Sequence, residues 1–284
     1  PFSYFDRDGE DVSDEVMELY HDLDLDGVVA IGGDGTMSIC HRMQKQGMNV
    51  VGVPKTIDND VAFTDRTFGF DTAVAIATEA IDRLHTTGQS HNRVMILETM
   101  GRYSGWIALE AGIAGGADVI LLPEIPFHVD EVARVCQERE DRQKFTIVAV
   151  AEGAKPEGGD LTVRETIDDS PDAIRLGGVG NAVREQLEPR LDSEIRTTVL
   201  GHIQRGGTPT AYDRILATNF GAYAASLIAQ GKFNRMVALQ GNEITLVALE
   251  NVASKNRNVP LDSMLVDSAV AVGTSFGNRD VEME

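Results

Sequence analysis

Short apolar runs that suit buried strands alternate with helix-like segments along most of this chain. Residues 27–31 form the first clear run, which ends in glycines and leads into a helix pattern at 36–46. The strand pattern returns at 49–53 and 93–98. Such alternation predicts a mostly parallel sheet with helices on both faces. In such folds, ligands bind at the loops that leave the carboxyl ends of the strands.

Length and composition indicate more than one lobe. The chain has 284 residues, of which 42% are hydrophobic, so it can bury more than one small core. We therefore expect an α/β protein of two lobes, each a mostly parallel sheet with helices on both faces, and an active site in the cleft between them. Further strands are expected at 117–122, 145–151 and 195–200, and helices from Asp71 onward and at 129–138, 172–187 and 212–230.

The net charge of −20 excludes some classes of partner. An acidic surface is repelled by the phosphates of nucleic acids and of anionic membranes, so we expect neither partner. No run approaches the roughly twenty apolar residues of a membrane span, and we see no signal-peptide pattern, which predicts a cytoplasmic protein. Cys40 and Cys136 are too few for a disulfide framework or a zinc site, and we expect buried thiols.

The segment at 32–36, Gly-Gly-Asp-Gly-Thr, follows the first strand pattern. Its glycines let backbone N–H groups approach a polyphosphate, and Asp34 is left to hold a metal ion. It is neither a Walker A loop nor a dinucleotide fingerprint, since Ser38 replaces the third fingerprint glycine. NAD kinases and diacylglycerol kinases share this pentapeptide, so it indicates a kinase without naming the acceptor. The alternative is a tight turn with a helix-capping aspartate.

The segment at 54–60, Pro-Lys-Thr-Ile-Asp-Asn-Asp, adds carboxylates and a lysine after the next strand pattern. A carboxylate beside an alcohol can take its proton while cations neutralise a migrating phosphoryl group. The two segments together predict phosphoryl transfer. For Asp60 a turn-capping role is the alternative.

Residues 54–60, followed by Thr-Phe-Gly-Phe-Asp-Thr-Ala at 67–73, resemble the 6-phosphofructokinases. The resemblance continues in family order at 90–93, 100–102, 114–116, 123–124, 151–153, 196–207 and 212–215. It implies transfer of a phosphoryl group from ATP and Mg²⁺ to the 1-hydroxyl of fructose 6-phosphate, giving fructose 1,6-bisphosphate in glycolysis.

The resemblance also implies roles for individual residues. Asp58 would be the general base, Arg102 would neutralise the transferred phosphoryl, and Asp34 would hold Mg²⁺. Glu152 would accept a hydrogen bond from the sugar. The implied catalytic residues are Asp58, Arg102 and Lys55; the donor-binding residues are Gly33, Asp34, Gly35 and Thr36; the substrate-binding residues are Thr56, Ile57, Asp58, Asp60, Arg93, Met100, Gly101, Arg102, Glu152, Arg196, His202 and Arg205.

Four of these residues would make a cationic pocket for the 6-phosphate: Arg93, Arg196, His202 and Arg205. In the family, the residues that match Arg93 and Arg196 reach the substrate of a neighbouring subunit. A homodimer or homotetramer with shared active sites is therefore implied. The alternatives are a solvated loop arginine at Arg102 and a structural histidine at His202.

The phosphoryl donor is indicated by two residues that disagree. Gly35 resembles the ATP users, because pyrophosphate users typically have an aspartate there that obstructs the nucleotide. Lys55 resembles the pyrophosphate users and a mixed third group. An excluded group is the harder constraint, so we expect ATP, with pyrophosphate as the alternative.

The resemblance assigns the donor-binding lobe to 1–69 plus 204–254 and the fructose 6-phosphate lobe to 70–203 plus 255–284. The family's opening strand and its Gly-Gly-Asp-x-Pro-Gly donor loop have no match in this sequence. A non-catalytic subunit that binds sugar phosphate is therefore a distant alternative, although Asp58, Arg102 and Asp34 are all retained. Another kinase with the 32–36 motif is a second one.

Overall fold

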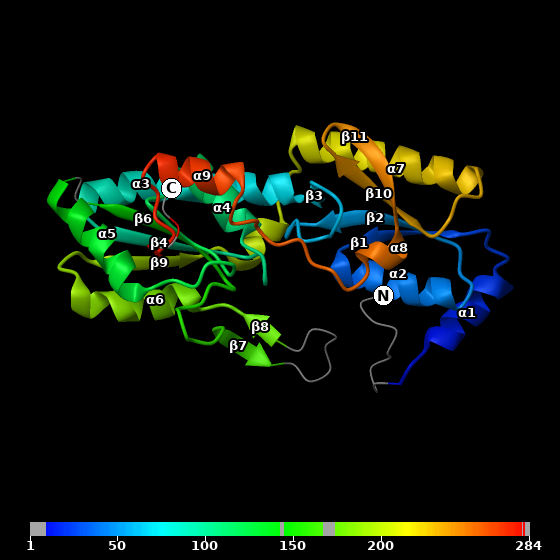
Figure 1. The fold of residues 1–284 in the computed structure, drawn as a ribbon, viewed down its shortest axis with the longest axis horizontal. Coiled ribbons are helices and arrows are strands. Elements are labelled where there is room, and N and C mark those ends of the chain that lie inside the picture. Colours follow the sequence, from blue (N-terminus) through cyan, green and yellow to red (C-terminus); the bar gives the residue numbers. More distant parts are fainter. Residues whose placement is uncertain (1–9, 143–144, 167–173, 280, 282–284) are drawn as a thin grey trace. The chain divides into compact units, whose positions relative to one another are not determined.

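The computed structural model describes residues 10–142, 145–166, 174–279 and 281. The described residues divide into two compact units (Figure 1). Unit 1 takes the chain up to Phe70 together with Pro209–Arg257, and unit 2 takes Asp71–Thr166, Ile174–Thr208 and the chain from Asn258 onward. Each helix that the structure describes is too short or too polar to span a lipid bilayer.

Unit 1 is built on one mostly parallel sheet. Within the described residues its strands are β1 (Val28–Gly32), β2 (Val50–Thr56), β3 (Phe68–Gly69), β10 (Arg235–Gln240) and β11 (Glu243–Ala248). They lie in the order β1-β2-β10-β11, and β3 pairs with the end of β2. β1, β3 and β10 run parallel to β2, whereas β11 is antiparallel to β10.

Helices cover both faces of this sheet. They are α1 (Ser13–Asp22), α2 (Asp34–Lys45), α7 (Ala211–Ala229) and the short α8 (Leu249–Val252). Buried residues of α1, α2 and α8, such as Met37, pack with Val50 in one core cluster. Phe220 of α7 packs with Val51 and Val53 in the other. Alternate residues of β2 thus serve opposite faces, as the pleat of a strand requires.

Unit 2 has a second, fully parallel sheet in the order β5-β6-β4-β9. These strands are β4 (Val94–Thr99), β5 (Val119–Leu121), β6 (Thr146–Ala151) and β9 (Ile195–Val199). A separate pair, β7 (Val163–Thr166) and β8 (Ile174–Leu176), is antiparallel.

The helices of unit 2 are α3 (Phe70–His91), α4 (Trp106–Ala114), α5 (Val129–Arg142), α6 (Val179–Leu187) and α9 (Met264–Ala271), with 3-10 turns η1 (Glu188–Arg190) and η2 (Gly201–Arg205). Figure 1 shows α3, α4 and α9 on one face and α5 and α6 on the other. Residues of α5 and α6 share one core cluster with alternate strand residues.

The structure confirms the predicted α/β class, with helices on both faces of mostly parallel sheets. One predicted helix is wrong in its first part. Residues 174–176 of the expected helix at 172–187 form β8, and α6 begins only at Val179; residues 172–173 lie outside the described part. Gly177 and Gly178 have φ of 135° and 91°, a conformation that interrupts a helix.

Both thiols are buried and free, as the sequence predicts. Burial in apolar surroundings raises the pKa of Cys40 to about 11 and that of Cys136 to about 12. Both cysteines are therefore protonated and unreactive near neutral pH.

Candidate active site

The amino terminus of α2 follows directly on β1. Gly33 is the N-cap residue, with φ −86° and ψ −161°, and among the described contacts it receives no side-chain cap. Asp34 is the first helical residue rather than a capping residue. Uncapped N–H groups and the helix dipole at such an end attract anions. The predicted donor residues Gly33–Thr36 thus form an end of a helix that suits phosphate.

Packing explains Gly32 in this segment and does not explain Gly35. A Cβ on Gly32 would lie 2.1 Å from the hydroxyl oxygen of Thr36, whereas a Cβ on Gly35 would meet no atom within 4 Å. Gly35 is the second residue of α2, and glycine is a weaker helix former than alanine. Its small size therefore needs a reason other than the fold of this chain.

The acidic loop, residues 57–60, follows the carboxyl end of β2 in the same unit. The Thr56 hydroxyl donates to Asp58 Oδ2 at 3.3 Å, and the Asp58 N–H donates to the Thr56 oxygen at 3.1 Å. Asp58 and Asp60 are buried, Ile57 is half-buried and Lys55 is exposed. The loop thus fixes a largely buried carboxylate within reach of a hydroxyl that orients it.

Residues from elsewhere in unit 1 brace this loop, and sequence reasoning missed them. The backbone N–H of Arg257 donates to the Asp60 carbonyl at 2.7 Å. The Thr67 hydroxyl donates to the Thr56 carbonyl at 2.9 Å. Thr67 stands in the segment that carries the family resemblance, whereas no local pattern marks Arg257.

The arginine loop, residues 100–105, follows β4 in unit 2. Gly101 and Arg102 have φ of 137° and 54°. The Glu152 Oε1 atom accepts the N–H groups of both residues, at 3.2 and 2.9 Å. A Cβ on Gly153 would lie 2.1 Å from the Arg102 carbonyl oxygen. Glu152 and Gly153, which follow β6, therefore fix the backbone from which the Arg102 side chain extends.

The turn η2 comes to the same edge of the unit 2 sheet. The Leu200 N–H, just before η2, donates to the Glu98 carbonyl near the end of β4 at 3.1 Å. His202 and Arg205 are exposed on η2, and a 3-10 turn places residues three apart on one side. Arg102, Glu152, His202 and Arg205 thus all follow the carboxyl ends of parallel strands of one sheet.

Arg93 and Arg196 lie at the opposite edge. Arg93 precedes β4, and Arg196 pairs in register with Met95, the second residue of that strand. The six residues of β4 span about 20 Å. A single chain therefore does not collect the four predicted cations in one pocket, and the assignment of Arg93 and Arg196 to a neighbouring subunit's substrate stays a prediction.

Glu194 joins these two arginines. Its Oε2 atom accepts from Arg93 Nε and its Oε1 atom from Arg196 Nη2. Glu194 directly precedes β9 and stands two residues before Arg196, a spacing at which side chains of an extended segment share one face. That spacing was the sequence signal for the contact, and it was missed.

A metal ion would find few protein ligands. Among the described residues, no three His, Cys, Asp or Glu side chains lie close enough together to hold one. Mg²⁺ commonly binds one or two carboxylates and completes its shell with water and substrate phosphates. The single carboxylate of Asp34, at a phosphate-suited helix end, fits that habit.

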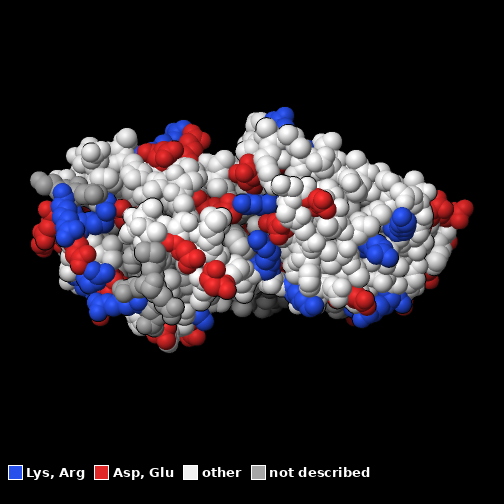
Figure 2. Space-filling view, turned by 45° about the horizontal axis from the view of Figure 1, so that its top comes forward, with Lys and Arg blue, Asp and Glu red and all other residues white. Residues whose placement is uncertain are grey.

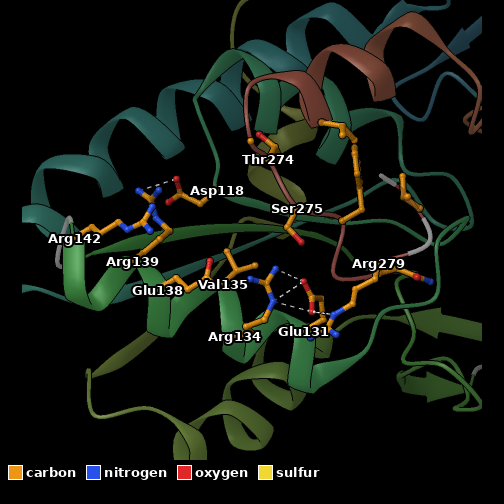
Figure 3. Close-up of a pocket in the computed structure, with 15 residues that line it drawn as sticks. Asp118, Glu131, Arg134, Val135, Glu138, Arg139, Arg142, Thr274, Ser275 and Arg279 are labelled. Atoms are coloured by element: carbon orange, nitrogen blue, oxygen red, sulfur yellow. Dashed lines mark hydrogen bonds and ion pairs between the residues drawn. The ribbon is translucent and has the colours of Figure 1, made fainter. Parts of the chain in front are cut away.

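A separate hollow of about 380 Å³ lies in unit 2, between α5 and the segment after α9 (Figure 3). Arg139 pairs with Asp118 at 2.8 Å, and Arg134 and Arg279 both pair with the buried Glu131. Figure 2 likewise shows acidic and basic side chains intermixed on the surface in view. The hollow contains none of the predicted site residues.

Known proteins resemble this chain over most of its length. A family model described as phosphofructokinase matches residues 3–228. The ATP-dependent 6-phosphofructokinase 2 of Clostridium perfringens is 53% identical over 271 residues, which cover 95% of this chain and 74% of the relative. The pyrophosphate–fructose 6-phosphate 1-phosphotransferase of Amycolatopsis mediterranei is 49% identical over 249 residues, or 88% of this chain and 73% of that protein.

A solved structure supports the fold. The pyrophosphate-dependent phosphofructokinase of Marinobacter aquaeolei matches with a TM-score of 0.77 at 23% identity, covering 94% of this chain and 68% of its own. The acidic loop after β2 and the arginine loop after β4 both fall within the residues that the family model matches. The chain belongs to the phosphofructokinase family.

Proposed function

We propose that the protein transfers the terminal phosphoryl group of ATP to the 1-hydroxyl of fructose 6-phosphate, a reaction that gives fructose 1,6-bisphosphate. The observation that carries the proposal is the buried Asp58 carboxylate beside the Thr56 hydroxyl, in a chain 53% identical to an ATP-dependent 6-phosphofructokinase. The enzyme is thus a phosphotransferase with an alcohol acceptor.

Asp58 removes the proton of the attacking hydroxyl. The Thr56 hydrogen bonds hold the carboxylate in place, and such a positioned base contributes about 10²–10⁴-fold to rate. Arg102 and Lys55 supply positive charge to the phosphoryl group as it moves. Asp60, Ile57, Met100 and Gly101 line the sugar site in this proposal.

The donor phosphates bind at the amino terminus of α2, through residues Gly33–Thr36. Asp34 would hold Mg²⁺ there, and a bound ion would supply positive charge to the donor phosphates. The open space around Gly35 supports ATP, because a glycine that packing does not require leaves room for a nucleotide. Lys55 and the 49% identical pyrophosphate-dependent relative support pyrophosphate as the second candidate.

The sugar phosphate is bound by basic residues at two places in the fold. His202 and Arg205 act with Glu152 at the carboxyl edge of the unit 2 sheet. Arg93 and Arg196, at the other edge, reach the substrate of a second subunit, so the enzyme is a homodimer or homotetramer. The two buried free thiols support a reducing, cytoplasmic location.

The test is the rate of fructose 1,6-bisphosphate formation by the full-length protein with Mg²⁺ and either ATP or pyrophosphate. We expect activity with ATP. Activity with pyrophosphate alone would make Lys55 the better guide to the donor, and no activity with either would favour a non-catalytic sugar-phosphate-binding subunit.

The variant Gly35→Asp tests the donor assignment. A Cβ at this position would meet no atom within 4 Å, so we expect the variant to fold. We expect the KM for ATP to rise at least about tenfold, because a carboxylate repels and obstructs the nucleotide phosphates. The KM for fructose 6-phosphate should not change. An unchanged KM for ATP would contradict the role of Gly35.

A further inference from the structure

Asn59 stands between the two buried aspartates of the acidic loop in an unusual backbone conformation. Its φ is 55°, in the left-handed region, which is rare for residues other than glycine and is tolerated best by asparagine. The residue is only 1% exposed. Its side chain therefore faces protein, unlike that of a typical turn asparagine at the surface.

The buried amide of Asn59 holds a second segment of unit 1. Its Oδ1 atom accepts the Thr67 N–H at 3.0 Å, and its Nδ2 group donates to the Asp65 carbonyl at 3.3 Å. One side chain thus satisfies a donor and an acceptor of the 65–67 segment. A carboxylate of the same shape could accept the first bond and could not donate the second.

The backbone of Asn59 is held as well. Arg257 Nη1 donates to the Asn59 carbonyl at 3.3 Å, and the Arg257 N–H bonds to the next carbonyl, that of Asp60. Contacts on both sides therefore fix a turn that begins at the Thr56 and Asp58 pair. The conformation is costly by itself, so it persists because its surroundings determine it.

A neutral side chain is also what this place requires. Asp58 and Asp60 are both buried, and a third carboxylate between them would be repelled by each. Asparagine is thus the residue that combines a left-handed backbone, one donor, one acceptor and no charge.

We propose that Asn59 is a positioning residue for Asp58: its left-handed backbone and its buried amide fix the turn that aims the Asp58 carboxylate at the acceptor hydroxyl. The inference rests on the proposed role of Asp58 as the base. Asn59 itself need not contact the substrate.

The variant Asn59→Gly tests this role. Glycine adopts the left-handed conformation without strain, so the change removes the amide and leaves the backbone conformation accessible. We expect kcat to fall about 10- to 100-fold, because misplacement of a reacting group by about 1 Å costs that much. The KM for fructose 6-phosphate should stay within about threefold, since the cationic residues that bind it lie in unit 2.

Asn234 supplies a matched control. It also has a left-handed backbone, with φ of 64°, and its side-chain oxygen accepts the Val50 N–H at 3.5 Å, away from the acidic loop. Asn234→Gly should lower the midpoint of thermal unfolding about as much as Asn59→Gly does, and it should keep the parent kcat.

Calorimetric titration with fructose 6-phosphate counts the folded sites. An Asn59→Gly enzyme that binds with parental stoichiometry and turns over slowly supports positioning. Parental kcat, or a loss of kcat that matches the loss of binding sites, would overturn it. If Asn59→Gly does not fold, Asn59→Ser takes its place, because it removes the amide without adding a charge, with the same loss of kcat expected.

Asp58→Ser, assayed alongside, separates this proposal from the proposed function. If Asp58→Ser keeps turnover, the base has been assigned wrongly and the proposed mechanism fails. If Asp58→Ser is inactive and Asn59→Gly is fully active, only the positioning role fails.

Discussion

The acidic loop and the arginine loop, one in each unit, each hold a left-handed residue in place, and they do so by different contacts. The acidic loop follows β2 and the arginine loop follows β4, both at the carboxyl ends of parallel strands. Each contains a non-glycine residue in the left-handed region, Asn59 with φ of 55° and Arg102 with φ of 54°. Such a conformation costs about 1–3 kcal/mol and clusters at functional sites.

The two residues differ in what holds them. Asn59 secures its own turn, because its side chain points inward and bonds to the 65–67 segment. Arg102 is secured from outside, by the Glu152 carboxylate and by the close approach of Gly153. The Arg102 side chain itself is half-buried. The difference is in keeping with the two proposals, that Asn59 positions Asp58 and that Arg102 acts on the phosphoryl group through its own side chain.

Removing the group that the acidic loop presents should have the largest effect. We expect Asp58→Ser to lower kcat by about 10²–10⁴-fold, because the attacking hydroxyl loses its base. Binding of fructose 6-phosphate, measured by calorimetry, should stay close to that of the parent. A variant that keeps most of its turnover would show that the acidic loop does not supply the base.

A substitution that displaces the backbone of the arginine loop should have the next largest effect. Gly153→Ala places a methyl group 2.1 Å from the Arg102 carbonyl, so the loop must move. We expect kcat to fall about 10- to 100-fold, as for other small displacements of reacting groups. The measurement is kcat with saturating ATP and sugar phosphate.

Gly221→Ala is the control for that change. Gly221 lies in α7, and a Cβ there would meet no atom within 4 Å. We expect parental kcat and a stability gain of about 0.5–1 kcal/mol, since alanine favours a helix. Equal kinetics in both variants would show that the Arg102 backbone tolerates displacement.

The alternation of strands and helices could be predicted from the sequence, because parallel strands are buried on both faces and appear as continuous apolar runs. The β8 strand could not be predicted. Its residues precede Gly177 and Gly178 and pair antiparallel with β7, as Leu176 does with Val163. Such pairing is a tertiary effect that local propensity does not contain.

The site residues were predictable as motifs, and their supports were not. Asp58 stands in a segment whose carboxylates and lysine indicate phosphoryl transfer, whereas the role of Arg102 is implied by the family resemblance. The left-handed backbone of Asn59 and the double acceptance by Glu152 Oε1 depend on where a second segment packs. Arg93 and Arg102 are separated because one precedes β4 and the other follows it. Their distance is therefore apparent only once that strand has been located.

The smallest expected effect concerns the two arginines at the amino edge of the unit 2 sheet. Glu194 pairs with both Arg93 and Arg196, and all three side chains are partly exposed. If both arginines bind a substrate phosphate, Glu194 competes with that phosphate for them. We expect Glu194→Gln to lower the KM for fructose 6-phosphate about two- to fivefold at low salt, the scale of exposed ion pairs, with kcat unchanged.

Salt dependence distinguishes this competition from a simple change of structure. Ions screen exposed charges over about 8 Å at physiological ionic strength, so the difference in KM between Glu194→Gln and the parent should shrink as salt is added. Glu79→Gln is the control, because Glu79 pairs with Arg83 on α3 in the same unit and is more exposed than Glu194. A KM that Glu194→Gln leaves unchanged, or raises at every salt concentration, would mean that the arginine pair does not bind the sugar phosphate. In that case only the residues at the carboxyl ends of the strands, Arg102, His202 and Arg205, would bind the sugar phosphate from unit 2.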